Sequence, residues 1–127
     1  LHGRSTSPTL ISSPAPTVWM DIERWHHDLL LELKTKIAER LRLHERVSEG
    51  FQHAIVRVDQ LLLLAKAARG HDYPSREQRI TTLECEVMQL QRNLLEEEVA
   101  CWRDVQKLEQ ELREVEKEAA ILGGGSA

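Results

Sequence analysis

The sequence predicts an all-α protein of two long helices separated by a short Gly/Pro break, the second helix being a coiled coil. Helix-forming residues dominate positions 21–122, and apolar residues recur there at intervals of three and four. Aromatic residues make up only 4% of the chain. Because a compact core normally depends on aromatic side chains, helices of this composition must bury their apolar faces against one another or against another chain.

The two ends of the chain carry no helical pattern. Residues 1–19 contain three prolines and many Ser and Thr residues, which predicts a disordered tail. The chain begins without methionine, and Met20 directly precedes the helical pattern, so this tail is interpreted as a leader or as added sequence. Residues 123–127 predict a flexible tail, with Gly123 as the helix C-cap.

The first predicted helix covers residues 20–69, with Asp21 as its N-cap. Residues 70–74 form the predicted break, because Gly70 stops a helix and Pro74 disfavours helical backbone at the residue before it. The second helix is expected at 75–122, where Ser75 and Gln78 have the spacing of a capping box.

The second helix has a heptad pattern with a four-residue stutter, because Leu94 and Val105 are eleven residues apart. Cys101 is a core position in either frame, and Cys85 faces outward. The apolar a and d positions are the predicted dimerisation surface. They are Ile80, Leu83, Val87, Leu90, Leu94, Val105, Leu108, Leu112 and Val115.

The first helix has a broader apolar stripe, in a frame that places Ile37 and His44 at a positions and Arg40 at a d position. Apolar residues also occupy several e and g positions, so contact with more than one neighbour is expected. The neighbour is either the second helix, folded back as a hairpin, or a foreign protein. The pattern leaves open a rod or a hairpin, parallel or antiparallel pairing, and the number of chains. His44 is interpreted as a polar core residue that sets register.

Trp25, Leu29 and Leu33 lie four residues apart near the start of the first helix. Trp is enriched at interface hot spots, and a helix bound in a groove presents anchors at this spacing. These residues are therefore candidate anchors for a protein partner. Ordinary amphipathic packing is the competing interpretation.

Composition excludes several other functions. Residues 75–122 contain seven Lys or Arg against twelve Asp or Glu, so nucleic-acid binding is not expected. The six histidines and two cysteines have no metal-ligand spacing, and no catalytic motif or cofactor site is recognised, so the chain is not expected to be an enzyme. No apolar run is long enough to span a membrane, and a cytoplasmic location is expected. The run Glu96-Glu97-Glu98 is expected to be a solvated face.

A resemblance adds to this interpretation. Trp25, Leu29 and Leu33, followed by Phe51, Ile55, Val58 and Leu62, a short break and heptads, are similar to the N-terminal part of the autophagy-related protein sixteen family. The resemblance implies a homodimeric scaffold of the autophagy conjugation machinery. Its partner-binding residues would be Trp25, Leu29, Leu33, Phe51 and Ile55.

In that family the first helix docks on autophagy protein five, which is joined to a ubiquitin-like protein. The coiled coil dimerises the complex and supports lipidation of a second ubiquitin-like protein. The resemblance implies that membrane contact occurs only through partners, at autophagosome precursor membranes. The alternative is a structural coiled-coil subunit of a cytoskeletal, centrosomal or kinetochore assembly, or a small-GTPase effector on a vesicle.

Overall fold

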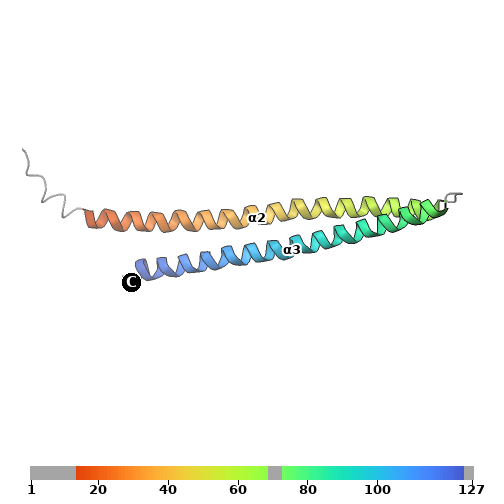
Figure 1. The fold of residues 1–127 in the computed structure, drawn as a ribbon. Helices are drawn as coiled ribbons and strands as arrows, with labels where there is room; N and C mark the ends of the chain where they lie inside the picture. The colour runs from red at the N-terminus through yellow and green to blue at the C-terminus, as the bar shows by residue number, and fades with distance from the viewer. Residues whose placement is uncertain (1–13, 69–72, 125–127) are drawn as a thin grey trace, which may run out of the picture. The chain divides into compact units, whose positions relative to one another are not determined.

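The computed structural model describes residues 14–68 and 73–124 and contains two helices, α2 (Pro14–Ala67) and α3 (Tyr73–Gly124) (Figure 1). The described residues contain no strand. The prediction of an all-α protein with two long helices is therefore confirmed. No helix among the described residues is both long enough and apolar enough to cross a membrane.

The start of α2 corrects the prediction for the N-terminal region. The helix begins at Pro14, so residues 14–19 are not part of a disordered tail and Asp21 is not an N-cap. Proline is tolerated in the first turn because the N–H groups there have no partner within the helix, and its fixed φ already suits a helix. The prediction for residues 1–13 lies outside the described residues.

The two helix ends beside the break both lie two residues earlier than predicted. The last helical residue of α2 is Ala67, and the Ala68 N–H still donates to the Leu64 carbonyl at 2.9 Å. Helix α3 begins at Tyr73, so Pro74 and Ser75 lie in its first turn rather than before it. Gly123 is helical rather than a C-cap, because α3 continues to Gly124. Residue 69 and the remainder of the predicted break, 70–72, lie outside the described residues.

The chain divides into two compact units, which are described separately. The hairpin unit is Ala38–Gln106, and it combines the C-terminal part of α2 with the N-terminal part of α3. The terminal unit combines α2 up to Ile37 with α3 from Lys107. In each unit a stretch of α2 pairs with a stretch of α3.

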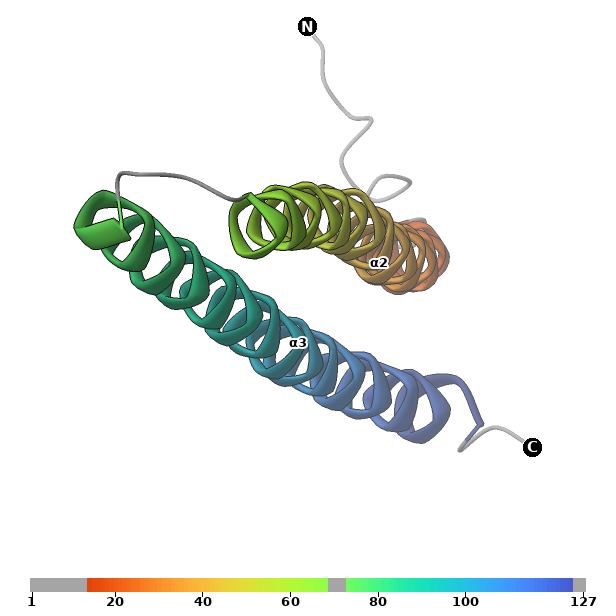
Figure 2. The same cartoon turned by 90° about the vertical axis from the view of Figure 1, so that its right-hand side faces the viewer.

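The core of the hairpin unit is a narrow seam between its two helical stretches. Val58, Ala65 and Leu83 are buried and form one cluster. The partly buried residues packed against this cluster come from both helices and are Leu62, Ile80, Val87 and Leu90. Figure 2 shows the two helices of the chain viewed from the C-terminal end of α2 and the N-terminal end of α3. On α3 these seam residues are a and d positions, whereas on α2 the a positions Val58 and Ala65 are joined by Leu62 at an e position, in keeping with the broader stripe of that helix.

The terminal unit has a seam of the same kind. Leu33 is buried with 3% of its surface exposed, and His26 is buried with 4% exposed. These two residues and Arg40 are seven apart, so the heptad frame of the first helix continues upstream of Ile37. On α3, Leu108, Leu112 and Val115 are half-buried.

The seams leave much apolar surface uncovered. No described side chain has less than 2% of its surface exposed, whereas large apolar residues such as Leu63, Leu64, Met88 and Trp102 are more than 60% exposed. A pair of helices can shield only the facing stripe of each partner. The described residues therefore present a small core and extensive apolar outer faces.

Candidate functional site

A polar layer interrupts the apolar seam of the hairpin unit. Arg40 makes a bidentate contact with Glu97, with Nη1 donating to Oε2 at 2.9 Å and Nη2 donating to Oε1 at 3.1 Å. The ring Nδ1 of His44 lies 2.9 Å from the same Glu97 Oε2, and Arg40 Nε donates to Asp104 Oδ2 at 2.8 Å. The layer thus joins two residues of α2 to two residues of α3.

The heptad pattern explains why the residues of this polar layer lie in the seam. Arg40 and His44 are the d and a positions assigned from the sequence, and His44 does lie half-buried in the seam. Counting three residues on from Leu94 makes Glu97 a d position. The expectation that Glu96-Glu97-Glu98 forms a solvated face is therefore wrong for Glu97, whose side chain is only 16% exposed. The core position was not recognised within this acidic run, because only its middle residue faces the seam and the residues on either side are exposed.

The electrostatics of the layer favour charge on both main partners. The hydrogen bonds from Arg40 hold the pKa of Glu97 below its ordinary value, with a smaller contribution in the same direction from His44, against the opposing effect of burial. The same contact, with Asp104 as a second acceptor, raises the pKa of Arg40 above its ordinary value. Because each charge is stabilised by its partner, the layer works as a unit.

This depressed pKa predicts that acid destabilises the hairpin unit. Glu97 binds its proton less readily in the folded protein than in the unfolded chain. Its stabilising contribution is therefore complete above the ordinary glutamate pKa of about 4.3 and is lost as the pH falls below that value. We expect wild type to lose more stability than Glu97→Gln between pH 6 and pH 3, as measured by urea unfolding. Equal losses would contradict this account.

His26 forms a second polar feature, at the seam of the terminal unit. Its ring lies against Trp25, with the centroids 5.1 Å apart, and Nε2 is 3.7 Å from Glu118 Oε1. Nε2 has no hydrogen-bond partner among the described residues. The hollow beside it, of about 190 Å³, is lined by both helices, including Ile22 and Ala119. That volume is smaller than a typical pocket for a drug-sized ligand.

The five predicted partner-binding residues have different surroundings. Trp25 is 57% exposed, whereas Leu33 is only 3% exposed. Leu29, Phe51 and Ile55 are half-buried. Trp25 lies in the terminal unit and Phe51 in the hairpin unit. Of the predicted anchors, only Trp25 is freely presented to a partner.

The predicted dimerisation residues lie in the seams of this chain. Leu83 is buried, and the other eight are half-buried. Those of the hairpin unit include Ile80, Val87 and Leu90, which pack against the cluster that contains Val58 of α2. In this structure, therefore, the a and d face of α3 is covered by α2. The prediction that it joins two chains stays a prediction.

Two features of the seams were missed from the sequence, although the heptad count could have found them. Extending the frame of the first helix upstream by two heptads gives His26 a d position, and extending the frame of the second helix past Leu94 gives Glu97 a d position. Cys101 is buried and Cys85 exposed, as expected. Within residues 14–68 and 73–124, no group of three or more His, Cys, Asp or Glu side chains could hold a metal ion.

The fold and its seams define a class of protein built from two long helices that pair along heptad faces, with charged residues inside the seam. The chain belongs to a family of unknown function, DUF8104, whose model matches residues 22–124. No curated protein and no solved structure matches the chain. The family match covers α2 from Ile22 onward and all of α3, including the polar layer and both seams.

Proposed function

We propose that this protein is a non-catalytic scaffold that binds other proteins through the outer faces of its helices. The observation that carries the proposal is the imbalance between a thin seam and extensive exposed apolar surface. Trp25, Leu63 and Trp102 are each more than half exposed, and extensive exposed apolar faces commonly mark sites of contact with other proteins. Burying these faces against other proteins would supply the free energy of binding.

The first partner site in this proposal is centred on Trp25. Its indole is 57% exposed and lies against the ring of His26, which is itself buried. A large exposed aromatic side chain supported by a buried neighbour is well suited to fill a pocket on a partner. Leu29 and Leu33 support this stretch of α2 from the seam rather than contacting the partner directly.

In its most specific form, the proposal follows the resemblance to the autophagy-related protein sixteen family. The partner would be autophagy protein five with its ubiquitin-like conjugate, and the complex would support lipidation of a ubiquitin-like protein. Two features support this form of the proposal. Trp25 lies in the N-terminal part of a long helix, and the chain has the order of helix, break and second helix. The alternative is a structural subunit of a cytoskeletal, centrosomal or kinetochore assembly, or a vesicle small-GTPase effector.

The test uses the full chain as bait, in wild-type form and as Trp25→Ala. We expect the substitution to weaken capture of purified autophagy protein five conjugate by about 2–4 kcal/mol, the range of an interface hot spot. Calorimetry or surface plasmon resonance would measure the change. Leu63→Ala is the matched control, because Leu63 is also highly exposed, at 67%, but lies in the other unit.

The possible outcomes separate the candidate functions. Loss of binding with Trp25→Ala and retention with Leu63→Ala would support docking through the region around Trp25. If wild type does not bind the conjugate, the autophagy form fails. If wild type binds and both variants bind equally well, Trp25 is not the anchor. Turnover of any substrate by the purified chain would overturn the non-catalytic proposal itself.

A further inference from the structure

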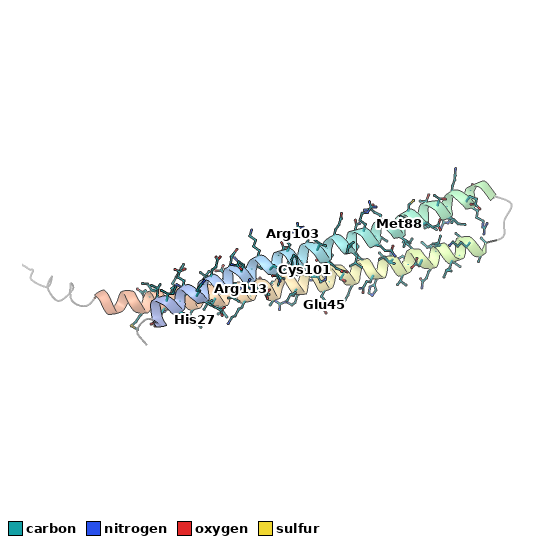
Figure 3. All side chains as sticks on the ribbon, turned by 90° about the horizontal axis from the view of Figure 1, so that it is seen from below. His27, Glu45, Met88, Cys101, Arg103 and Arg113 are labelled. Atoms are coloured by element: carbon teal, nitrogen blue, oxygen red, sulfur yellow. The ribbon has the colours of Figure 1, made fainter. Side chains whose placement is uncertain are left out.

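The hairpin unit carries a second stripe on α3, separate from the seam and apolar except for Arg92. Its members alternate three and four residues apart, like a second set of core positions, and all are exposed. We call this set the outer stripe. It consists of Cys85, Met88, Arg92, Leu95, Val99 and Trp102. Figure 3 labels Met88 of this stripe and Cys101 of the seam.

The outer stripe points away from the helix that α3 already contacts. At about 100° per residue, the stripe's centre lies roughly 150° around α3 from the middle of the seam. Met88, Leu95 and Trp102 are 61%, 59% and 66% exposed, so α2 does not cover them. The stripe is also bounded, because the next positions at the same spacing are Gln78 and Thr81 before it and Gln106 and Glu109 after it.

We propose that the outer stripe binds the outer stripe of a second copy of this chain, with the two α3 helices antiparallel. The inference deepens the proposed scaffold function, and rests on it, by assigning the surface through which the scaffold self-associates. A two-fold interface must be complementary to itself, because the same patch contributes both sides. The outer stripe meets that requirement in one register.

In that register the two-fold axis of the dimer passes between Arg92 and Leu95. Each layer of the interface then pairs a smaller side chain of one copy with a larger side chain of the other. Cys85 lies opposite Trp102 of the second copy, and Met88 lies opposite Val99. Such pairs fill the space between two helices evenly, whereas a parallel in-register pair would place two Trp102 rings in one layer and two Cys85 side chains in another. The stripe from Cys85 to Trp102 would be buried over about 26 Å of helix.

Charge favours the same arrangement. Arg92 would lie opposite Leu95 of the second copy, beside that copy's Glu96, which offers a carboxylate to the guanidinium. In a parallel in-register dimer the two Arg92 side chains would meet in one layer. At the positions that flank the antiparallel interface, Gln89 would face Glu96 of the second copy and Gln91 would face Glu98 of the second copy. No like charges would therefore face each other there.

The experiment measures the mass of the purified full chain by sedimentation equilibrium at neutral pH under reducing conditions. Wild type is expected to sediment at about twice the chain mass of 14.6 kDa. Leu95→Glu is expected to weaken association by about a hundredfold or more, since each dimer would contain the change twice. Leu63→Glu is the control, because Leu63 is 67% exposed on α2 and lies outside the outer stripe. It should leave the dimer intact, and circular dichroism should show equal helix content in both variants.

Orientation is tested through Cys85, which is exposed, while Cys101 is buried. In the antiparallel register the two Cys85 residues are separated by about 17 residues of helix, or roughly 25 Å, so mild oxidation should leave the dimer free of disulfide links. Efficient Cys85 cross-linking would overturn the inference, as would a monomeric wild type or a dimer unaffected by Leu95→Glu. The docking test with Trp25→Ala uses a different variant and a different measurement, so failure of the docking site and failure of the outer stripe can be distinguished.

Discussion

Replacement of Arg40 by alanine is expected to lower the free energy of unfolding by about 2–4 kcal/mol, because it leaves Glu97 partly buried without its main partner. The side chains of Arg40 and Glu97 are only 14% and 16% exposed, so water can compensate for little of the lost contact. Urea unfolding followed by circular dichroism at one fixed protein concentration would measure the change, since self-association also affects apparent stability.

Asp104→Ala provides the matched control for the polar layer. Asp104 accepts a hydrogen bond from the same guanidinium, but its side chain is 55% exposed. Exposed ion pairs contribute at most about 1 kcal/mol, so this substitution should have a much smaller effect. If Asp104→Ala proved as damaging as Arg40→Ala, the buried contact with Glu97 would not be the main source of stability in the layer.

The second large effect is expected for Leu83→Ala, at about 2–4 kcal/mol of lost stability. Leu83 is 6% exposed and packs in one cluster with Val58 and Ala65. Truncation would remove buried methyl groups and leave a cavity that a seam between two rigid helices can close only in part. The same unfolding experiment would detect this loss.

Leu63→Ala is the control for the core substitution because it makes the same chemical change on an exposed face. Leu63 is 67% exposed, and surface substitutions usually change stability by less than about 0.5 kcal/mol. Equal effects of the two substitutions would mean that the seam is not the principal core of the hairpin unit. A larger effect of Leu63→Ala would show that another chain covers α2.

The helical fold was predictable because its signals are local and repeated. Heptad spacing from Ile80 to Leu94 and from Val105 to Leu122 favours a helix whatever its partner. The ends of the helices were less predictable. Two prolines within residues 14–19 indicated disorder, although proline is compatible with the first turn of a helix.

The polar layer shows why a site between two paired helices is harder to predict than the helices themselves. His44 and Arg40 were placed in the seam from the sequence, but their partner was not, because the pattern left the choice between a hairpin and a foreign helix open. Glu97 was assigned to a solvated face since it has an acidic residue on each side. Only the pairing of the two helices reveals that a carboxylate faces the guanidinium.

The polar layer also limits how the two helices of the hairpin unit can slide. Apolar seams tolerate a shift of one heptad, because leucine and valine can exchange neighbours with little change in contact area. A seven-residue slip that moved Glu97 next to Val47 and Phe51 would instead leave its carboxylate among apolar side chains, and Arg40 would lose its acceptor. A chain with leucine in place of Arg40, His44 and Glu97 would have no such penalty. Its NMR resonances would be broadened by exchange among registers.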